Sequence, residues 1–253
     1  MSHFDSYREL IEKLPVSVSD RTLNEALLMS SEGDISTYYA PFDYINARAK
    51  IVIIGITPGL QQARNSLIEA RKLLAAGVPV EEARRRAKET ASFSGGMRNN
   101  LTAMLDHIGI HTLMGIKSSS ELFSTESHLA HFTSALRYPV FLKGGNYNGN
   151  PKITKYKTLV AQIESHLKEE LLQFGPDTVF VPLGPKVSEA VAMTGVAENQ
   201  VLHGLPHPSP ASGERVAYFL GRKEKHMLSK VTNGDSIDAA KAGLIAKISA
   251  LRS

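Results

Sequence analysis

The stretch Ile51 to Leu60, IVIIGITPGL, constrains the fold of this chain more than any other. Apolar residues occupy consecutive positions from Ile51, which is typical of a strand buried on both faces, as in a parallel sheet. Gly55 and the Pro58-Gly59 pair then end the strand in a turn. Such a run is often only a turn. The backbone freedom on both sides of Thr57 equally suits a loop whose N–H groups face a ligand.

Further apolar runs predict more strands, and helical spacing fills the segments between them. We expect strands at 50–57, 131–140, 177–184 and 199–207, and helices at 64–76, 80–90, 99–108, 154–174, 185–193 and 235–252. This alternation predicts an α/β fold, a three-layer α/β/α sandwich with a short, mostly parallel central sheet. We expect residues 1–253 to form a single domain. Ligands bind such sheets at the carboxyl ends of the strands, so the loops 55–59 and 203–214 are expected to converge in one site.

The composition excludes several classes of site. The chain has 253 residues and no cysteine, which excludes disulfides, thiolate zinc sites and cysteine-ligated iron–sulfur clusters. His107 and His111 are four residues apart, but Gly109 intervenes and no carboxylate completes a metalloprotease motif, so we read them as ordinary surface or helix-end residues. We predict no metal and no cofactor. Dinucleotide, P-loop and G-x-S-x-G serine hydrolase motifs are missing as well.

The charge and hydropathy of the chain limit the cellular location and the binding partners that we expect for it. The N-terminus is charged throughout and lacks the apolar core of a signal peptide, and no apolar run approaches the roughly 18 to 20 residues that span a membrane. We therefore expect a cytoplasmic, monomeric protein that does not bind membranes. The net charge of +4 permits binding to nucleic acid through phosphates but does not demand it.

The sequence HPSP places His207 between two prolines, which lock the local backbone. A rigidly held imidazole at the end of a strand is suited to donate a hydrogen bond to a developing anion. The alternative is an ordinary exposed histidine in a loop. Phe93 precedes Gly95-Gly96 and either stacks on a flat ligand or packs in the core.

Two basic segments carry two readings each. The cluster Arg84, Arg85, Arg86 and Lys88 is either a solvated helix face or a contact to the DNA backbone. The loop KGGNYNGNPK at 143–152 is either an ordinary surface loop or a loop that contacts phosphate.

These motifs, taken in their order along the chain, resemble the uracil-DNA glycosylase superfamily. GITPGL is similar to the Gly-x-Asn-Pro-Gly motif of its mismatch-specific and single-strand-selective branches, and HPSPAS is similar to the His-Pro-Ser-Pro motif of its uracil-specific branches. FVPLGPKVSEAV at 180–191 resembles the third strand, loop and helix of the superfamily. The resemblance covers about residues 48–220. It implies an enzyme that flips a damaged base out of DNA and cleaves its N-glycosidic bond.

The resemblance also implies roles for single residues. His207 would stabilise the oxygen of the leaving base, and Phe93 would stack on that base. The segment Gly55, Ile56, Thr57, Pro58 and Gly59 would line the pocket. Ser209 would hold a DNA phosphate, and Arg215, rather than the small Ala211, would serve as wedge or phosphate contact. We add Arg84 and Arg85 as DNA contacts.

Two residues depart from the family pattern. Thr57 stands where the family places an acid or amide that orients water, and Ser134 stands where it commonly places the asparagine that reads uracil. From these departures we expect Thr57 to hold water by its hydroxyl alone and Ser134 to relax base specificity. The leading hypothesis is a DNA glycosylase that excises uracil or related deaminated bases in base excision repair. One alternative is a non-catalytic DNA or nucleobase-binding protein on the same fold, and another is an unrelated α/β enzyme acting on a small nucleotide.

Overall fold

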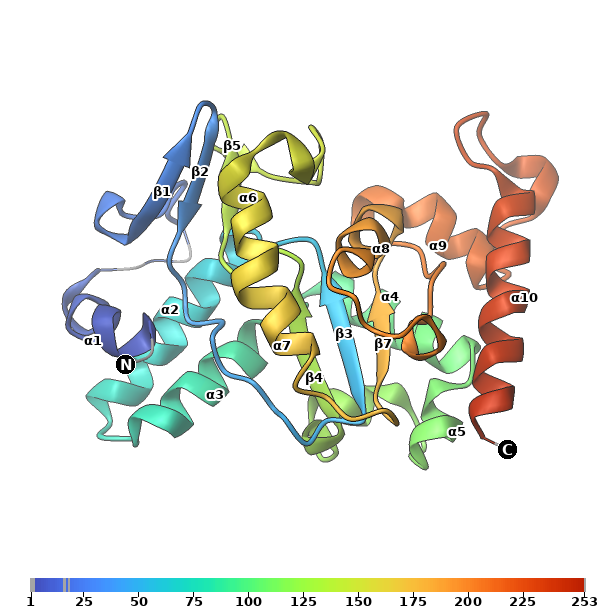
Figure 1. The fold of residues 1–253 in the computed structure, drawn as a ribbon, viewed down its shortest axis with the longest axis horizontal. Helices are drawn as coiled ribbons and strands as arrows, with labels where there is room; N and C mark the ends of the chain where they lie inside the picture. Colours follow the sequence, from blue (N-terminus) through green and yellow to red (C-terminus); the bar gives the residue numbers. More distant parts are fainter. Residues whose placement is uncertain (1–2, 16, 18, 253) are drawn as a thin grey trace.

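The computed structural model describes residues 3–15, 17 and 19–252 of the chain. Its centre is a parallel sheet in the order β4-β3-β7, shown in Figure 1. The strands are β3 (Ile51–Gly55), β4 (Ala130–Ser134) and β7 (Val179–Pro182). β3 pairs in parallel with both neighbours, so its carboxyl end lies beside those of β4 and β7.

The alternation of side chains along β3 divides the core into two layers. Ile51 and Ile53 belong to an apolar cluster completed by α4 (Gly96–His107), α5 (Ile110–Met114), α9 (Gly213–Phe219) and α10 (Gly234–Leu251). Val52 and Ile54 belong to a second cluster, completed by α6 (Lys157–Gln162), a π-helical segment (Ile163–Lys168), α7 (Glu169–Leu171) and α8 (Pro185–Ala192). Helices therefore cover both faces of the sheet, which confirms the predicted three-layer α/β fold.

A second sheet, which the sequence did not predict, lies beside α6 in Figure 1. It is antiparallel, in the order β1-β2-β5-β6, and consists of β1 (Leu28–Glu32), β2 (Ile35–Tyr38), β5 (Val140–Leu142) and β6 (Gly145–Asn146). A third apolar cluster joins residues of this region to α1 (His3–Lys13), α2 (Leu60–Ala75) and α3 (Val80–Ala91). Tyr7 of α1 stacks on Tyr39 with ring centroids 4.1 Å apart.

Two predicted strands are shorter than expected. The run 131–140 divides, because the chain leaves the parallel sheet after Ser134 and enters the antiparallel sheet at Val140. The carbonyl of Pro139 accepts a hydrogen bond from the Tyr38 N–H, at the start of that second sheet. The run 199–207 forms only an isolated parallel bridge between Val201 and Phe180. The prolines at 206 and 208 lack the N–H groups that would extend this pairing.

The helices predicted at 64–76, 80–90, 99–108, 185–193 and 235–252 are present with shifted ends. The helix predicted at 154–174 runs from Lys157 to Leu171 and widens into the π-helical segment at its middle. Within the described part of the chain, no helix is both long and apolar enough to cross a membrane.

Candidate active site

A cavity of about 330 Å³ lies at the carboxyl ends of β3 and β4. The GITPG loop and the HPSP loop both line it, so the predicted convergence of these loops is found. Most of the site residues predicted from the sequence line this one cavity: Gly55, Ile56, Thr57, Pro58, Gly59, Phe93, Ser134, His207 and Ser209. A pocket formed by loops at strand ends is the usual location of an active site in an α/β sheet.

The backbone around His207 fixes the tautomer of its imidazole. The Ser209 N–H donates to Nδ1 of His207 at 3.2 Å, which leaves Nε2 as the protonated nitrogen of the neutral ring. Burial lowers the pKa of His207, so the ring is neutral at pH 7. Asn100 of α4 donates to the Pro208 carbonyl at 3.0 Å and holds the loop in place. The site therefore offers one oriented N–H donor from His207.

Gly184, the residue before α8, links the end of β7 to the histidine loop. Its φ of +94° is a conformation that side chains disfavour, and a Cβ built there would lie 3.7 Å from the His207 Cβ. The Gly184 N–H donates to the Leu205 carbonyl at 3.0 Å. The position of His207 thus depends on the end of β7 as well as on its own prolines.

Phe93 forms an aromatic wall of the cavity. It has a φ of +50°, uncommon for a bulky residue, and directly follows the C-terminal end of α3. Its ring meets Phe132 edge to face at a centroid distance of 6.0 Å. Phe93 belongs to the core and also lines the cavity, so its position is compatible with core packing and with stacking on a flat ligand.

Gly55 gives the Phe93 ring its room. A Cβ at Gly55 would lie 3.3 Å from the ring and 3.5 Å from the Ser134 Oγ. Gly55 and Ser134 are partners in the parallel register of β3 and β4. The three residues therefore meet at one edge of the cavity, with the smallest residue between the other two.

The Thr57 hydroxyl has two backbone partners. Oγ1 donates to the Tyr138 carbonyl and accepts from the Val140 N–H, both at 3.0 Å. A hydroxyl has one proton, so Thr57 cannot also donate to a water molecule; one acceptor lone pair remains. What the structure shows for this side chain is a tie between the end of β3 and the start of β5. Water binding at Thr57 stays a prediction.

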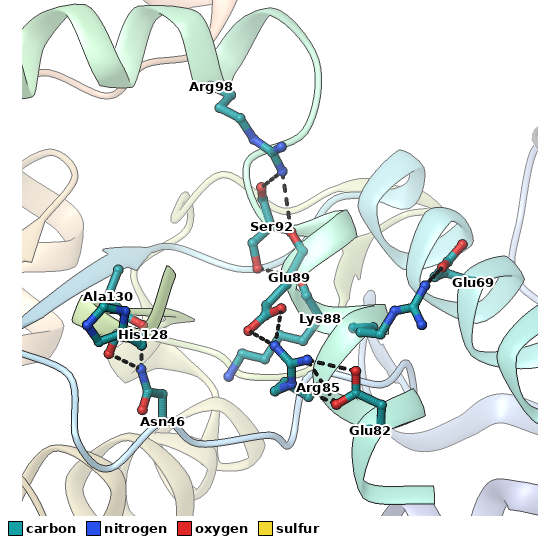
Figure 2. A network of polar contacts seen from close by, with 11 residues as sticks. Asn46, Glu69, Glu82, Arg85, Lys88, Glu89, Ser92, Arg98, His128 and Ala130 are labelled. Atoms are coloured by element: carbon teal, nitrogen blue, oxygen red, sulfur yellow. Dashed lines mark hydrogen bonds and ion pairs between the residues drawn. The ribbon is translucent and has the colours of Figure 1, made fainter. Parts of the chain in front are cut away.

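The predicted arginine contacts lie outside the cavity. Arg85 is paired with Glu82 and Glu89 of its own helix, as Figure 2 shows, and Arg84 is paired with Glu81. These acids offset the charge, so the geometry of α3 favours a solvated helix face over a DNA contact. Arg215 is exposed in the first turn of α9, five residues after Pro210 of the HPSP motif.

Lys88 belongs to the same basic run, but it turns inward. It is only 3% exposed, lines the cavity, and donates from Nζ to the Tyr44 carbonyl at 2.6 Å. Figure 2 shows its side chain extending toward the side of Asn46 and Ala130, opposite to Glu69. Burial lowers the pKa of Lys88 to about 8. No local pattern indicates this orientation, because Lys88 is one of four basic residues close together in the sequence.

Arg137 is a second cation at the cavity that the sequence analysis missed. It pairs with Glu170 of α7, which is itself fully buried, and it donates to the His166 carbonyl in the π-helical segment at 3.3 Å. Burial alone would raise the pKa of Glu170, but the charges of Arg137 and Lys88 outweigh burial and lower it. Glu170 is therefore an ionised carboxylate that pairs with Arg137 without itself lining the cavity.

His131 completes this buried group as a neutral ring. Its Nε2 lies 2.5 Å from Glu170, and its Nδ1 accepts from the Asn46 N–H at 3.3 Å. Both nitrogens are thus satisfied without a second ring proton. Burial, reinforced by the charge of Lys88, lowers the pKa of His131 to about 4.

The glycine-rich loop at 143–152 contributes Asn146 to the rim of the cavity. Asn146 Oδ1 accepts from the Leu60 N–H at 2.9 Å, and Gln62 Oε1 accepts from the Gly59 N–H at 2.8 Å. Both amides therefore fix the start of α2 while they border the cavity. Among the described residues that line the cavity there is no aspartate or glutamate. In the described part of the chain, no group of three or more His, Cys, Asp or Glu side chains is placed to hold a metal ion.

Comparison with known proteins agrees with this geometry. A sequence model of the family described as "Uracil DNA glycosylase superfamily" matches residues 42–231. A Bacillus subtilis (strain 168) protein described as "Uncharacterized protein YoxB" is 35% identical over 227 residues, which cover 87% of this chain and 88% of that protein. No solved structure matches the chain significantly. With a matching model over most of its length and the paired GITPG and HPSP loops at one cavity, the chain belongs to the uracil DNA glycosylase superfamily.

Proposed function

We propose that this protein is a DNA glycosylase that flips a deaminated base, uracil or a related base, into the cavity and cleaves its N-glycosidic bond. The observation that carries the proposal is the imidazole of His207, whose Nδ1 is occupied by the Ser209 N–H and whose ring lines the same cavity as Phe93. A base must leave the DNA stack to reach such a cavity.

In the proposed reaction, the bond between C1′ of the sugar and the ring nitrogen of the base breaks, and its electron pair goes to the base. The Nε2–H of His207 donates to the base oxygen on which negative charge grows, while Phe93 stacks on the ring. The cationic sugar is captured by water, which loses a proton to solvent. Because bond breaking runs ahead of water attack, stabilisation of the leaving anion supplies most of the required acceleration, and a cavity without a carboxylate can still support the reaction.

DNA contacts in this proposal come from the residues around the cavity mouth. Ser209 lines the cavity, and the exposed Arg215 follows it in the first turn of α9, where it can reach a phosphate or the gap left by the flipped base. The cytoplasmic location and the monomeric state expected from the sequence stay predictions.

The second candidate is a protein that binds DNA or a nucleobase without cleaving it. Two observations favour it: the described residues that line the cavity include no acid, and the one proton of the Thr57 hydroxyl is used on the Tyr138 carbonyl. The lining therefore lacks a carboxylate to take a proton from water, and Thr57 can orient water only through its remaining lone pair.

Incubation with oligonucleotides that contain uracil, hypoxanthine or xanthine, followed by alkaline cleavage, separates the two candidates. A glycosylase leaves abasic sites that alkali converts to strand breaks, and His207→Ala slows their formation strongly. Tight binding of these oligonucleotides with no break at any base would establish the non-catalytic candidate instead.

A further inference from the structure

The most buried polar groups of the cavity wall lie away from the two family motifs. Thr133 is 6% exposed, and its Oγ1 has no hydrogen-bond partner among the described residues. Lys88 is buried beside the same cavity, and the Tyr44 carbonyl is the acceptor for its ammonium group, which carries three protons. A buried hydroxyl without a partner destabilises the folded protein, so a ligand atom that forms a hydrogen bond with Thr133 would recover that cost.

The charged side chains of lysine and arginine in the described cavity lining are positive, and no acidic side chain offsets them there. Lys88 and Arg137 both line the cavity, whereas Glu170, which holds Arg137, does not. With no Asp or Glu in the described lining, the wall presents donors and positive charge to whatever enters. The Lys88 ammonium and the Arg137 guanidinium only donate, so they accept nothing from an amine but bind a carbonyl oxygen well, and the Thr133 hydroxyl can donate to the same oxygen.

We propose that Lys88 and Thr133 form a base-reading floor that selects bases with carbonyl oxygens on the inserted edge, such as uracil and xanthine. Arg137 adds positive electrostatic potential to this floor. This inference rests on the proposed function and gives it a substrate class. The floor takes the place of the asparagine that Ser134 replaces. Contrary to the expectation from Ser134 alone, it implies discrimination against cytosine and adenine, whose exocyclic amines would direct hydrogens at a buried cation.

The same cation also favours the reaction. Negative charge that reaches the base during bond cleavage spreads over its carbonyl oxygens, and a fixed charge in a water-poor cavity stabilises it strongly. Burial holds the pKa of Lys88 near 8, so its ammonium form still predominates at neutral pH. In this proposal the charge of Lys88 and the N–H of His207 both stabilise the leaving base, because both residues line the cavity.

The test compares Lys88→Met, which keeps the length of the side chain and removes its charge, with Thr133→Val and with Lys88→Arg. The matched control is Arg86→Met on the same helix, a partly exposed residue outside the cavity. Single-turnover excision is measured on oligonucleotides containing uracil, xanthine, hypoxanthine or cytosine. Binding of free uracil and free xanthine is measured in parallel by thermal shift, which needs no cleavage.

We expect Lys88→Met to reduce excision of uracil and xanthine on the order of 10²–10³-fold and Thr133→Val about tenfold. Both should lose free-base binding, Lys88→Arg should restore part of it, and Arg86→Met should match the wild type. Folded Lys88→Met and Thr133→Val proteins that keep wild-type excision and the wild-type preference for uracil over cytosine overturn the floor. Thr133→Val decides alone if Lys88→Met does not fold.

The measurement of free-base binding tests the base-reading floor independently of the proposed glycosylase activity. If the wild type excises no base but binds free uracil or xanthine, and Lys88→Met abolishes this binding, the glycosylase proposal falls and the floor stands. If the wild type neither excises nor binds any of these bases, both fall.

Discussion

The Ser209 N–H points at Nδ1 of His207 from 3.2 Å, two residues away in the same proline-bounded loop. This contact keeps Nε2 protonated in a neutral ring, so the donor is in place before a base arrives and needs no change of ionisation.

His207→Ala removes this donor. We expect excision to fall on the order of 10²–10³-fold, the usual cost of one preorganised donor, while affinity for DNA changes little. Single-turnover kinetics and fluorescence anisotropy on the same uracil oligonucleotide measure the two quantities. His203→Ala is the matched control, because His203 precedes the HPSP motif and contacts Glu198 outside the cavity. Equal excision by His207→Ala and the wild type would remove His207 from the mechanism.

Thr57→Val keeps the shape of the side chain and removes the hydroxyl that bridges Tyr138 and Val140. We expect a loss of about 1–3 kcal/mol in the free energy of unfolding, because two backbone groups lose their partner. This corresponds to a fall in Tm of about 2–4 °C for each kcal/mol. Thr57→Ser retains the hydroxyl and should keep both stability and excision. If Thr57→Val loses excision at unchanged Tm, the hydroxyl acts on water rather than on the fold.

Gly55→Ala tests the packing between β3 and the aromatic wall. The added methyl would lie 3.3 Å from the Phe93 ring, so the ring must move by a few tenths of an ångström. Because catalysis depends on ångström-scale placement, we expect excision to fall on the order of 10- to 100-fold. The control is Gly96→Ala, whose Cβ would meet no atom within 4 Å and whose φ, like that of Gly55, lies outside the left-handed region. A Gly55→Ala protein as active as the wild type would show that Phe93 does not need this position.

The arginines of α3 and Arg215 should differ in their effect on DNA affinity. Replacing Arg84, Arg85 and Arg86 with alanine should leave the salt dependence of DNA binding unchanged, because Glu81, Glu82 and Glu89 offset the charges of Arg84 and Arg85. Arg215→Ala should reduce the slope of log Kd against log salt by about one. Titrations at several salt concentrations measure both slopes. A flatter slope in the triple variant alone would show that the arginines of α3 contact DNA and that Arg215 does not.

His131 predicts a loss of stability in acid. Its pKa is about 4 in the folded protein against an ordinary value of 6.5, so the unfolded chain takes up a proton before the folded protein does. The free energy of unfolding therefore falls as the pH drops from about 6.5 to about 4, by up to about 3 kcal/mol. Urea unfolding at a series of pH values measures this slope. In His131→Gln, whose amide can still donate to Glu170, the slope over this interval should fall but not vanish, because burial lowers the pKa of His166 to about 4 as well; an unchanged slope would assign it to other groups.

The sequence predicts the central sheet and the two loops because their signals are local. Uninterrupted apolar residues mark β3 and β7, and the prolines around His207 mark the loop that carries it. The sequence did not predict the hairpin of β1 and β2, since both strands mix polar and apolar residues. No residue of LMSSE is buried, and ISTY is buried on one face only.

The cavity floor also escaped the sequence reading, for a different reason. Lys88 lies in a basic helical run, and only the packing of α3 beside β4 distinguishes it from the arginines that precede it. Arg137 follows Ser134 by three residues in a segment read as one continuous strand, although the chain there turns between sheets. Buried cations of this kind depend on partners far away in sequence, here Glu170 and Tyr44, and no local pattern records them.

The bridge from Thr57 to Tyr138 and Val140 fastens the parallel sheet to the antiparallel one, and so sets how the molecule opens. Opening of the cavity at this point requires either that the two Thr57 hydrogen bonds break or that β5, which is paired with β2, moves as well. The amide protons of Val140 and Ile53 should therefore exchange with solvent at similarly slow rates, as members of one cooperative unit. No described side chain of β1 or β2 lines the cavity. Because β2 pairs with β5, the hairpin of β1 and β2 nevertheless influences the shape of the cavity from a distance.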